Sequence, residues 1–180
     1  MIPDELLLRP GTIPIFSIRN PRLAIPSAHR VMQRMGLEHG AGELNFFTVT
    51  CPIWNRLIYD FYVSYGYSPL VIDADDYLTD MDVVRAVCSN VGMDPDKLQL
   101  SWPAITAEEK TEIHPMLYAS QSKLFASSGP DPARAARNID LIAEMQRWDQ
   151  EFGADAAEMK ELVEIAMPHY EYLRTKRMKI

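Results

Sequence analysis

The sequence predicts an α/β fold in which a short parallel sheet is flanked by helices, with a helix-rich C-terminal half. Two continuous apolar runs, residues 12–18 (TIPIFSI) and 69–72 (PLVI), are typical of parallel strands that are buried on both faces. Helical patterns follow both runs, and this alternation favours a three-layer α/β arrangement. The length of 180 residues suits one domain, and we expect residues 1–180 to form it.

Composition narrows the functional classes. The net charge of −7 and the absence of a basic stripe argue against a general nucleic-acid-binding protein. The two cysteines, Cys51 and Cys88, provide no disulfide framework and favour a reducing compartment, so we expect a cytoplasmic protein. No apolar run approaches the roughly 18 residues of a membrane span, and the first residues lack a secretory leader pattern. We therefore expect no membrane partner.

The two helices of the N-terminal half have recognisable start signals. Pro26 and Ser27 are predicted to open the first helix, which runs to about Met35. Residues 37–47 are punctuated by glycines and are predicted to form a loop. Thr50 has the character of an N-cap for the second helix. The apolar residues of that second helix keep helical spacing: Ile53, Leu57, Ile58, Phe61 and Tyr65.

The helix after the second strand has signals at both ends. Its start is predicted at a capping box, in which Thr79 is the cap and Asp82 lies three positions later. Gly92 is expected to end it. The valines between these signals recur at helical spacing, so we expect them to form a buried face: Val83, Val84, Val87 and Val91.

The C-terminal half is predicted to be helical after a long irregular segment. Residues 94–132 are rich in proline and serine, and only one short helix is expected there, near residues 115–125. Two longer helices are predicted at about residues 138–152 and 154–167. Pro168 is expected to end the last one, because proline cannot donate a backbone hydrogen bond within a helix.

An arginine and a serine around the first strand form a candidate anion site. Arg19 directly follows the strand, and ligands bind at the carboxyl ends of strands in open α/β sheets. Ser27 lies at a predicted helix start, where backbone N–H groups favour an anion. Arg19 can also grip phosphate oxygens through two parallel hydrogen bonds. The alternative is that Arg19 pairs with a nearby carboxylate and that Ser27 only caps the helix.

Three segments resemble parts of sulfotransferases. IRNPRLAIPSAHR, residues 18–30, is similar to the 3′-phosphate-binding segment of that family, and Arg19, Ser27 and His29 fall on its pattern. SPLVIDADDYLTDMDVVRAVCSNVGMDPDKLQLSW resembles the strand, acidic turn and helix that follow in the family. MQRWDQEFGADAAEMKELVEIAMPHYEYL resembles its closing tryptophan segment and last helix. The similarity extends over residues 12–172 and implies a remnant of the P-loop, sulfotransferase-like fold of fungal secondary metabolism.

The sequence also departs from that pattern. Proteins of the family carry a strand, a phosphosulfate-binding loop and a helix before the Arg-Asn-Pro segment, and here eleven residues precede the first predicted strand. No GxxxxGK[ST] motif is present. Such a loop supplies preorganised donors to the transition state, so we expect no sulfuryl transfer by this chain alone and no nucleotide cofactor.

Three side chains are candidate acids or bases, and one more is a candidate substrate contact. Asp73 directly follows the second strand in the stretch DADD, which either matches an acid motif of terpene cyclases or forms a turn. His29 is either a general base or an ordinary helix histidine. Asp60, beside aromatic residues, has either a raised pKa or an exposed position. His114 precedes a proline and could line a pocket. No pair of histidines has metal-ligand spacing, so we expect no metal.

Three functions are consistent with these residues. The one the sequence favours is a cofactor-independent cyclase, isomerase or lyase that acts by acid–base chemistry on a hydrophobic polyketide or terpenoid. The alternatives are a sulfonucleotide-binding sulfotransferase completed by another chain and a non-catalytic interaction module. Because the absence of a first strand would leave an unpaired sheet edge, we also expect a homodimer that covers it.

Overall fold

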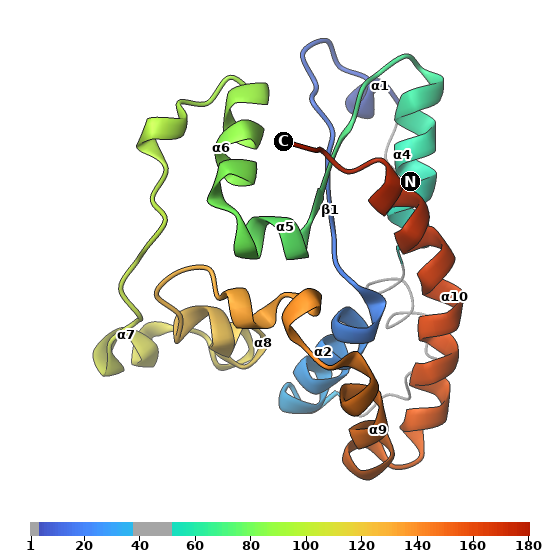
Figure 1. Ribbon diagram of the computed structural model, residues 1–180. Coiled ribbons are helices and arrows are strands. Elements are labelled where there is room, and N and C mark those ends of the chain that lie inside the picture. Colours follow the sequence, from blue (N-terminus) through green and yellow to red (C-terminus); the bar gives the residue numbers. More distant parts are fainter. Residues whose placement is uncertain (1–3, 38–51) are drawn as a thin grey trace.

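A two-stranded parallel sheet lies at the centre of the molecule, with helices on both sides (Figure 1). The computed structural model describes residues 4–37 and 52–180. Strand β1 (Ile15–Ile18) pairs with β2 (Leu70–Asp73) in the register Ile15 to Leu70. The predicted α/β class, with its short parallel sheet and helix-rich C-terminal half, is confirmed.

One face of the sheet is closed by two helices, α4 (Ile53–Ser64) and α10 (Asp155–Thr175), which run along one side of it in Figure 1. Side chains alternate along a strand, and every second residue of β1 and β2 is buried on this face. The resulting core cluster consists of Phe16, Ile18, Tyr62, Val71, Tyr170 and Leu173.

A second core lies below the sheet, where α2 (Pro21–Arg34) and α9 (Leu141–Phe152) pack against the first half of α10. Trp148 of α9 is fully buried there, so its large apolar area stabilises the packing of α9 against α10. The other buried members are Ile25, Phe152, Ala156, Met159, Leu162, Val163 and Ala166.

The second face of the sheet is less tightly covered. Helices α5 (Ala74–Thr79) and α6 (Met81–Asn90) stand on this side (Figure 1). They leave an apolar groove of about 300 Å³ between the sheet and α6, lined by Ser17, Ile72, Tyr77, Val83, Val84 and Val87. The remaining elements are α1 (Asp4–Leu7), η1 (Pro95–Lys97), α7 (Ala107–Glu112), α8 (Pro115–Phe125), η2 (Pro132–Arg134) and η3 (Ala136–Asn138).

Helix α2 begins five residues earlier than predicted. The Asn20 side chain accepts a hydrogen bond from the Arg22 backbone N–H (3.0 Å), and Pro21 occupies the first turn, where its missing N–H costs nothing. Pro26, which was expected to open the helix, lies inside it at the loss of one backbone hydrogen bond. The predictions for Thr50 and for the loop after residue 37 fall on residues outside the described ranges.

Two other predicted helix ends were wrong. Asp80, rather than Thr79, caps α6 by accepting from the Asp82 N–H (2.9 Å), and Thr79 instead ends α5. Helix α10 continues through Pro168 to Thr175, because its apolar residues on both sides of the proline pack into the core. Tertiary burial therefore outweighs the local preference of proline for a helix end.

The C-terminal tail covers the outer edge of β2. The N–H of Met178 donates to the carbonyl oxygen of Val71 (2.8 Å), and the Arg177 guanidinium lies 3.1 Å from a carboxylate oxygen of Asp76. This edge of the sheet is therefore occupied by the chain itself. Among the described residues no helix is both long and apolar enough to cross a membrane.

Candidate functional site

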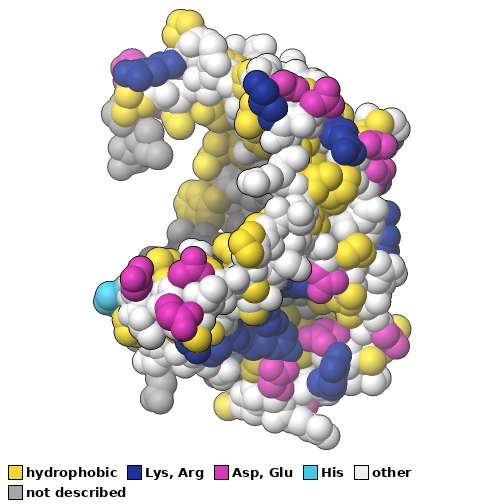
Figure 2. All heavy atoms as spheres, turned by 90° about the vertical axis from the view of Figure 1, so that its left-hand side faces the viewer, with side chains coloured by type: hydrophobic (Ala, Val, Ile, Leu, Met, Phe, Trp, Pro, Cys, Tyr) yellow, Lys and Arg dark blue, Asp and Glu magenta, His cyan; other side chains and the backbone are white. Residues whose placement is uncertain are grey.

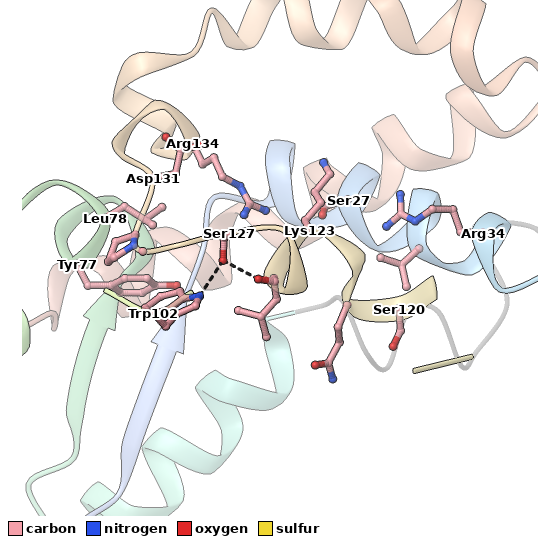
Figure 3. Close-up of a pocket in the computed structure, with 15 residues that line it drawn as sticks. Ser27, Arg34, Tyr77, Leu78, Trp102, Ser120, Lys123, Ser127, Asp131 and Arg134 are labelled. Carbon is pink, nitrogen blue, oxygen red and sulfur yellow. Dashed lines mark hydrogen bonds between the residues drawn. The ribbon is translucent and has the colours of Figure 1, made fainter. Parts of the chain in front are cut away.

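A pocket of about 420 Å³ lies where α2, α5 and α8 meet beyond the sheet, and basic side chains gather around it (Figure 3). The view of the α6 and α7 side in Figure 2 shows the surface hollowed between an upper and a lower part, with Lys and Arg side chains gathered below the hollow. The lining residues on which the site depends are Ser27, Arg34, Tyr77, Trp102, Lys123 and Arg134.

Helix α2 and the turns after α8 hold these side chains in place. Ser27 and Arg34 lie two turns apart on α2, so both face the same side of that helix. Asp131 accepts a hydrogen bond from the Ala133 N–H (3.0 Å) and starts η2, the short helix that ends at Arg134. The Trp102 indole donates to the hydroxyl of Ser127 (3.3 Å), as the dashed line in Figure 3 shows.

The pocket concentrates positive charge. Burial lowers the pKa of Lys123, and the neighbouring charges of Arg134, Arg30, Arg34 and Arg19 lower it further. In the view of Figure 3 the Lys123 amino group lies between the guanidinium groups of Arg134 and Arg34. An anion in the pocket would remove the repulsion that destabilises the charged lysine.

Arg19 belongs to the same positive region. Burial lowers its pKa, and the charge of Arg134 is the next cause. Its Nε atom is buried without a hydrogen-bond partner in the described part of the chain. Within residues 4–37 and 52–180, no ion pair of 4.0 Å or less joins Arg19, Lys123 or Arg134 to a carboxylate. By contrast, Arg30 is held by two glutamates at the edge of this region.

Of the predicted residues, the structure brings Arg19 and Ser27 together around this pocket. Ser27 lines it directly. The charge of Arg134, which lines it, lowers the pKa of Arg19, and the charge of Asp75 opposes that shift. Arg19 thus lies in a positively charged region near the carboxyl end of β1, and its pairing with a local carboxylate is not observed in the described residues. The expectation that Ser27 lies at a helix start was wrong, because α2 begins at Pro21 and the backbone N–H groups next to Ser27 belong to the interior of the helix.

The two main candidate acids and bases lie far apart. His29 is buried with its Nε2 atom 3.3 Å from Asp155, at the start of α10. Asp73 is buried and accepts a hydrogen bond of 2.8 Å from the Tyr170 hydroxyl, near the end of α10. A helix rises 1.5 Å per residue, so Asp155 and Tyr170 are separated by roughly 22 Å along α10. One substrate atom cannot contact both groups.

The environments of His29 and Asp73 are those of the protein core. His29 packs edge-on against the ring of Phe152, with the ring centroids 5.0 Å apart. Burial raises the pKa of Asp73, although hydrogen bonds from the Asp75 N–H and the Tyr170 hydroxyl oppose this. Arg174 lies 3.8 Å away from the same carboxylate. Asp73 also caps α5, so its position has a structural explanation.

Asp60 and His114 lie outside the pocket. Asp60 accepts a hydrogen bond of 2.6 Å from the Tyr172 hydroxyl between α4 and α10, with Arg56 3.6 Å away. His114 is exposed and caps α8, its Nδ1 accepting from the Met116 N–H (3.3 Å). Among the described residues, no group of three or more His, Cys, Asp or Glu side chains is arranged to hold a metal ion.

The sequence did not indicate two of the cations near the pocket, Lys123 and Arg134. Lys123 lies in the short helix predicted near residues 115–125, and Arg134 follows the proline- and serine-rich stretch, so no motif singled out either side chain. A usable signal was the run SSGPDPAR, residues 127–134, because a turn rich in glycine and proline often presents a functional side chain at its end.

The geometry defines an α/β chain with a pocket that is lined by several cations beyond the end of a parallel strand. No family model and no solved structure matches the chain. Two proteins named sulfotransferase ppzF, from Metarhizium majus and Metarhizium rileyi, are each 36% identical to it over 192 aligned positions, which cover 99% of this chain. The chain belongs to a sulfotransferase-like family with fungal members. It spans 56% of the length of these relatives.

Proposed function

We propose that this chain forms the phosphate-binding part of a sulfotransferase-like site and holds a nucleotide of the phosphoadenosine phosphosulfate type. The observation that carries the proposal is the group of cations Arg19, Lys123 and Arg134, which have no carboxylate partner among the described residues. Three such cations suit a phosphate monoester, which carries close to two negative charges and several acceptor oxygens.

The pocket also suits the rest of a nucleotide. Its volume of about 420 Å³ falls within the range of roughly 300–1,000 Å³ that is usual for small-molecule sites. Tyr77 and Trp102 supply aromatic surface next to the cations, and Ser27 adds a hydroxyl that can donate to a phosphate oxygen. The names of the two relatives support a sulfonucleotide as the ligand.

Each residue has a defined task in this proposal. Arg134 and Lys123 neutralise the phosphate from one side, and Arg19 does so from the end of β1. Burial of Arg19 strengthens its attraction to an anion, because less solvent screens the charge. The chain spans about half the length of its relatives, so we propose sulfuryl transfer only for a site that further polypeptide completes.

Isothermal titration calorimetry with adenosine 3′,5′-bisphosphate tests the proposal. Arg134→Ala and Lys123→Ala should each weaken binding by about 10- to 100-fold, the usual effect of losing one charge-assisted hydrogen bond. Arg85→Ala is the matched control, because Arg85 is an exposed arginine of α6 outside the pocket. The affinity should also fall with rising salt. Absence of binding, or equal affinity in all three variants, would overturn the proposal.

Acid–base chemistry on a hydrophobic polyketide or terpenoid, without a nucleotide, is the second candidate. The raised pKa of Asp73 favours it, because a carboxyl group that keeps its proton can act as an acid. It ranks second because His29 lies elsewhere and because Asp73 alternates with Ile72, so its side chain points away from the apolar groove. With a candidate substrate, Asp73→Asn should then slow turnover by about 10²- to 10⁴-fold.

A further inference from the structure

An apolar groove opens beside the cation pocket, the pocket of about 420 Å³ that Lys123 and Arg134 line. The groove has a volume of about 360 Å³ and lies where the segment before α7 meets the end of α8. Two of its large hydrophobic side chains are open to solvent, since Trp102 is 37% and Leu124 52% exposed. We call it the Trp102 groove, and it is lined by Trp102, Pro103, Ile105, Leu124 and Phe125. Concave apolar surfaces of this kind are typical of ligand sites.

Hydrogen bonds hold the two walls of the Trp102 groove together. The Ile105 N–H donates to the carbonyl oxygen of Phe125 (3.1 Å). The Ser127 hydroxyl accepts from the Trp102 indole (3.3 Å) and donates to the carbonyl oxygen of Leu124 (2.6 Å), as the dashed lines in Figure 3 show. The groove is therefore formed before a ligand enters it, and a preformed site loses less conformational entropy on binding.

The Trp102 groove and the cation pocket share part of their walls. Trp102 and Leu124 line both of them. Lys123 precedes Leu124 in α8, so the Cα atoms of the cation and of the groove residue are about 3.8 Å apart. A positively charged surface and an apolar surface therefore meet within the width of one side chain.

The charges of the cation pocket determine which kind of molecule suits both surfaces. Asp131 is the carboxylate among the described residues that line the pocket, and it is engaged as the cap of η2 by the Ala133 N–H (3.0 Å). Lys123 and Arg134 have no carboxylate within 4.0 Å in the described ranges. A neutral apolar ligand would leave these charges without a counterion, whereas a ligand with a negative charge at one end is complementary to both surfaces.

We infer that the Trp102 groove and the cation pocket together bind an anionic amphiphile, a small molecule in which an apolar chain is joined to a phosphate group. The phosphate binds to Lys123 and Arg134, whose N–H groups donate to its oxygens. The chain lies in the groove against Trp102 and Leu124. Because the two surfaces adjoin, one molecule reaches both, and it needs no adenine. The inference therefore goes beyond the proposed nucleotide and does not rest on it.

Isothermal titration calorimetry with two alkyl phosphates tests this inference. Methyl phosphate and octyl phosphate carry the same head group and differ only in the length of the chain. Below the concentration at which it forms micelles, octyl phosphate should bind at least about tenfold more tightly, because several CH₂ groups leave water in the groove. Equal affinities, or no binding of either phosphate, would overturn the inference. The titration with adenosine 3′,5′-bisphosphate would still decide the proposed function separately.

Two variants separate the groove from the cations. Leu124→Ser should weaken the binding of octyl phosphate by about three- to tenfold and leave that of methyl phosphate unchanged, because it alters only the apolar surface. Arg134→Ala should weaken both ligands by about tenfold or more, because it removes a charge-assisted hydrogen bond. Loss of methyl phosphate affinity in the folded Leu124→Ser variant, equal to the loss for octyl phosphate, would overturn the division into two surfaces.

Leu117→Ser is the matched control. Leu117 is also an apolar residue of α8 and is 44% exposed, but it lines neither the Trp102 groove nor the cation pocket. Circular dichroism verifies that each variant is folded. Both phosphates should bind this variant as they bind the parent. If Leu117→Ser and Leu124→Ser weaken octyl phosphate equally, the chain does not bind in the groove and the inference is overturned.

A second copy of the chain is the competing occupant of the groove. Size-exclusion chromatography with light scattering distinguishes it from a small ligand. We expect the Leu124→Ser variant to have the same mass as the parent. A pair of 20.5 kDa chains that Leu124→Ser separates would overturn the inference, because the groove would then be an interface between copies.

Discussion

The two edges of the central sheet differ in how their backbone hydrogen-bonding groups are covered. At the β2 edge the tail donates one backbone hydrogen bond to Val71, and Arg177 holds the tail against Asp76. At the β1 edge the described chain offers only the side chain of Asn55, which lies 3.5 Å from the Ser17 carbonyl oxygen. Among the described residues, the chain thus covers one edge of the sheet with its own tail and leaves the other edge largely uncovered.

The largest expected effect compares two isoleucines of the same strand. Ile18 is 3% exposed on the closed face, so Ile18→Ala should reduce the free energy of unfolding by about 2–5 kcal/mol. Ile15 is 45% exposed, so Ile15→Ala should change it by less than about 1 kcal/mol. Urea unfolding followed by circular dichroism measures both. Equal costs would mean that Ile15 is covered in solution, and the contrast between the two ends of β1 would be lost.

The next effect concerns the buried carboxylate at the end of β2. Tyr170→Phe removes the hydrogen bond to Asp73 and should cost about 1–3 kcal/mol. Tyr172→Phe removes a similar bond to the more exposed Asp60 and should cost less than about 1 kcal/mol. Chemical unfolding of both variants at pH 7 measures the difference.

The cost of Tyr170→Phe should depend on pH. Burial raises the pKa of Asp73, whereas the Tyr170 hydroxyl favours the ionised form and opposes that rise. The variant therefore has the higher Asp73 pKa, and its loss of stability is fully present above that pKa. As the pH falls and Asp73 becomes protonated, the difference from the parent should shrink. A deficit that is constant from pH 4 to pH 8 would contradict this assignment.

The smallest expected effect concerns the hydrogen bond by which the C-terminal tail covers the outer edge of β2. Met178→Pro removes the N–H that Val71 accepts and should cost about 0.5–1.5 kcal/mol. Lys179→Pro changes the next residue of the tail and should cost less, because no backbone bond from Lys179 to β2 is present in the described structure. If the two variants unfold at the same temperature, the tail does not protect this edge.

Much of the fold could be predicted because local patterns carry it. The apolar runs around Phe16 and Val71 are strands since both must be buried between layers, and the valines of α6 recur at helical spacing. Helix ends were harder to predict. Asn20 and Asp80 both cap helices, but the side chain that accepts the N–H is decided by short-range competition among several polar residues.

By itself, the sequence determined the α/β class, the two strands and the position of Arg19 directly after the first strand. These follow from hydrophobic period and chain order, which act over a few residues. Only the tertiary structure decided that Lys123 and Arg134 join Arg19, because residues about a hundred positions apart meet through packing that no local period encodes. The same packing placed His29 and Asp73 at opposite ends of α10, where its length keeps them apart.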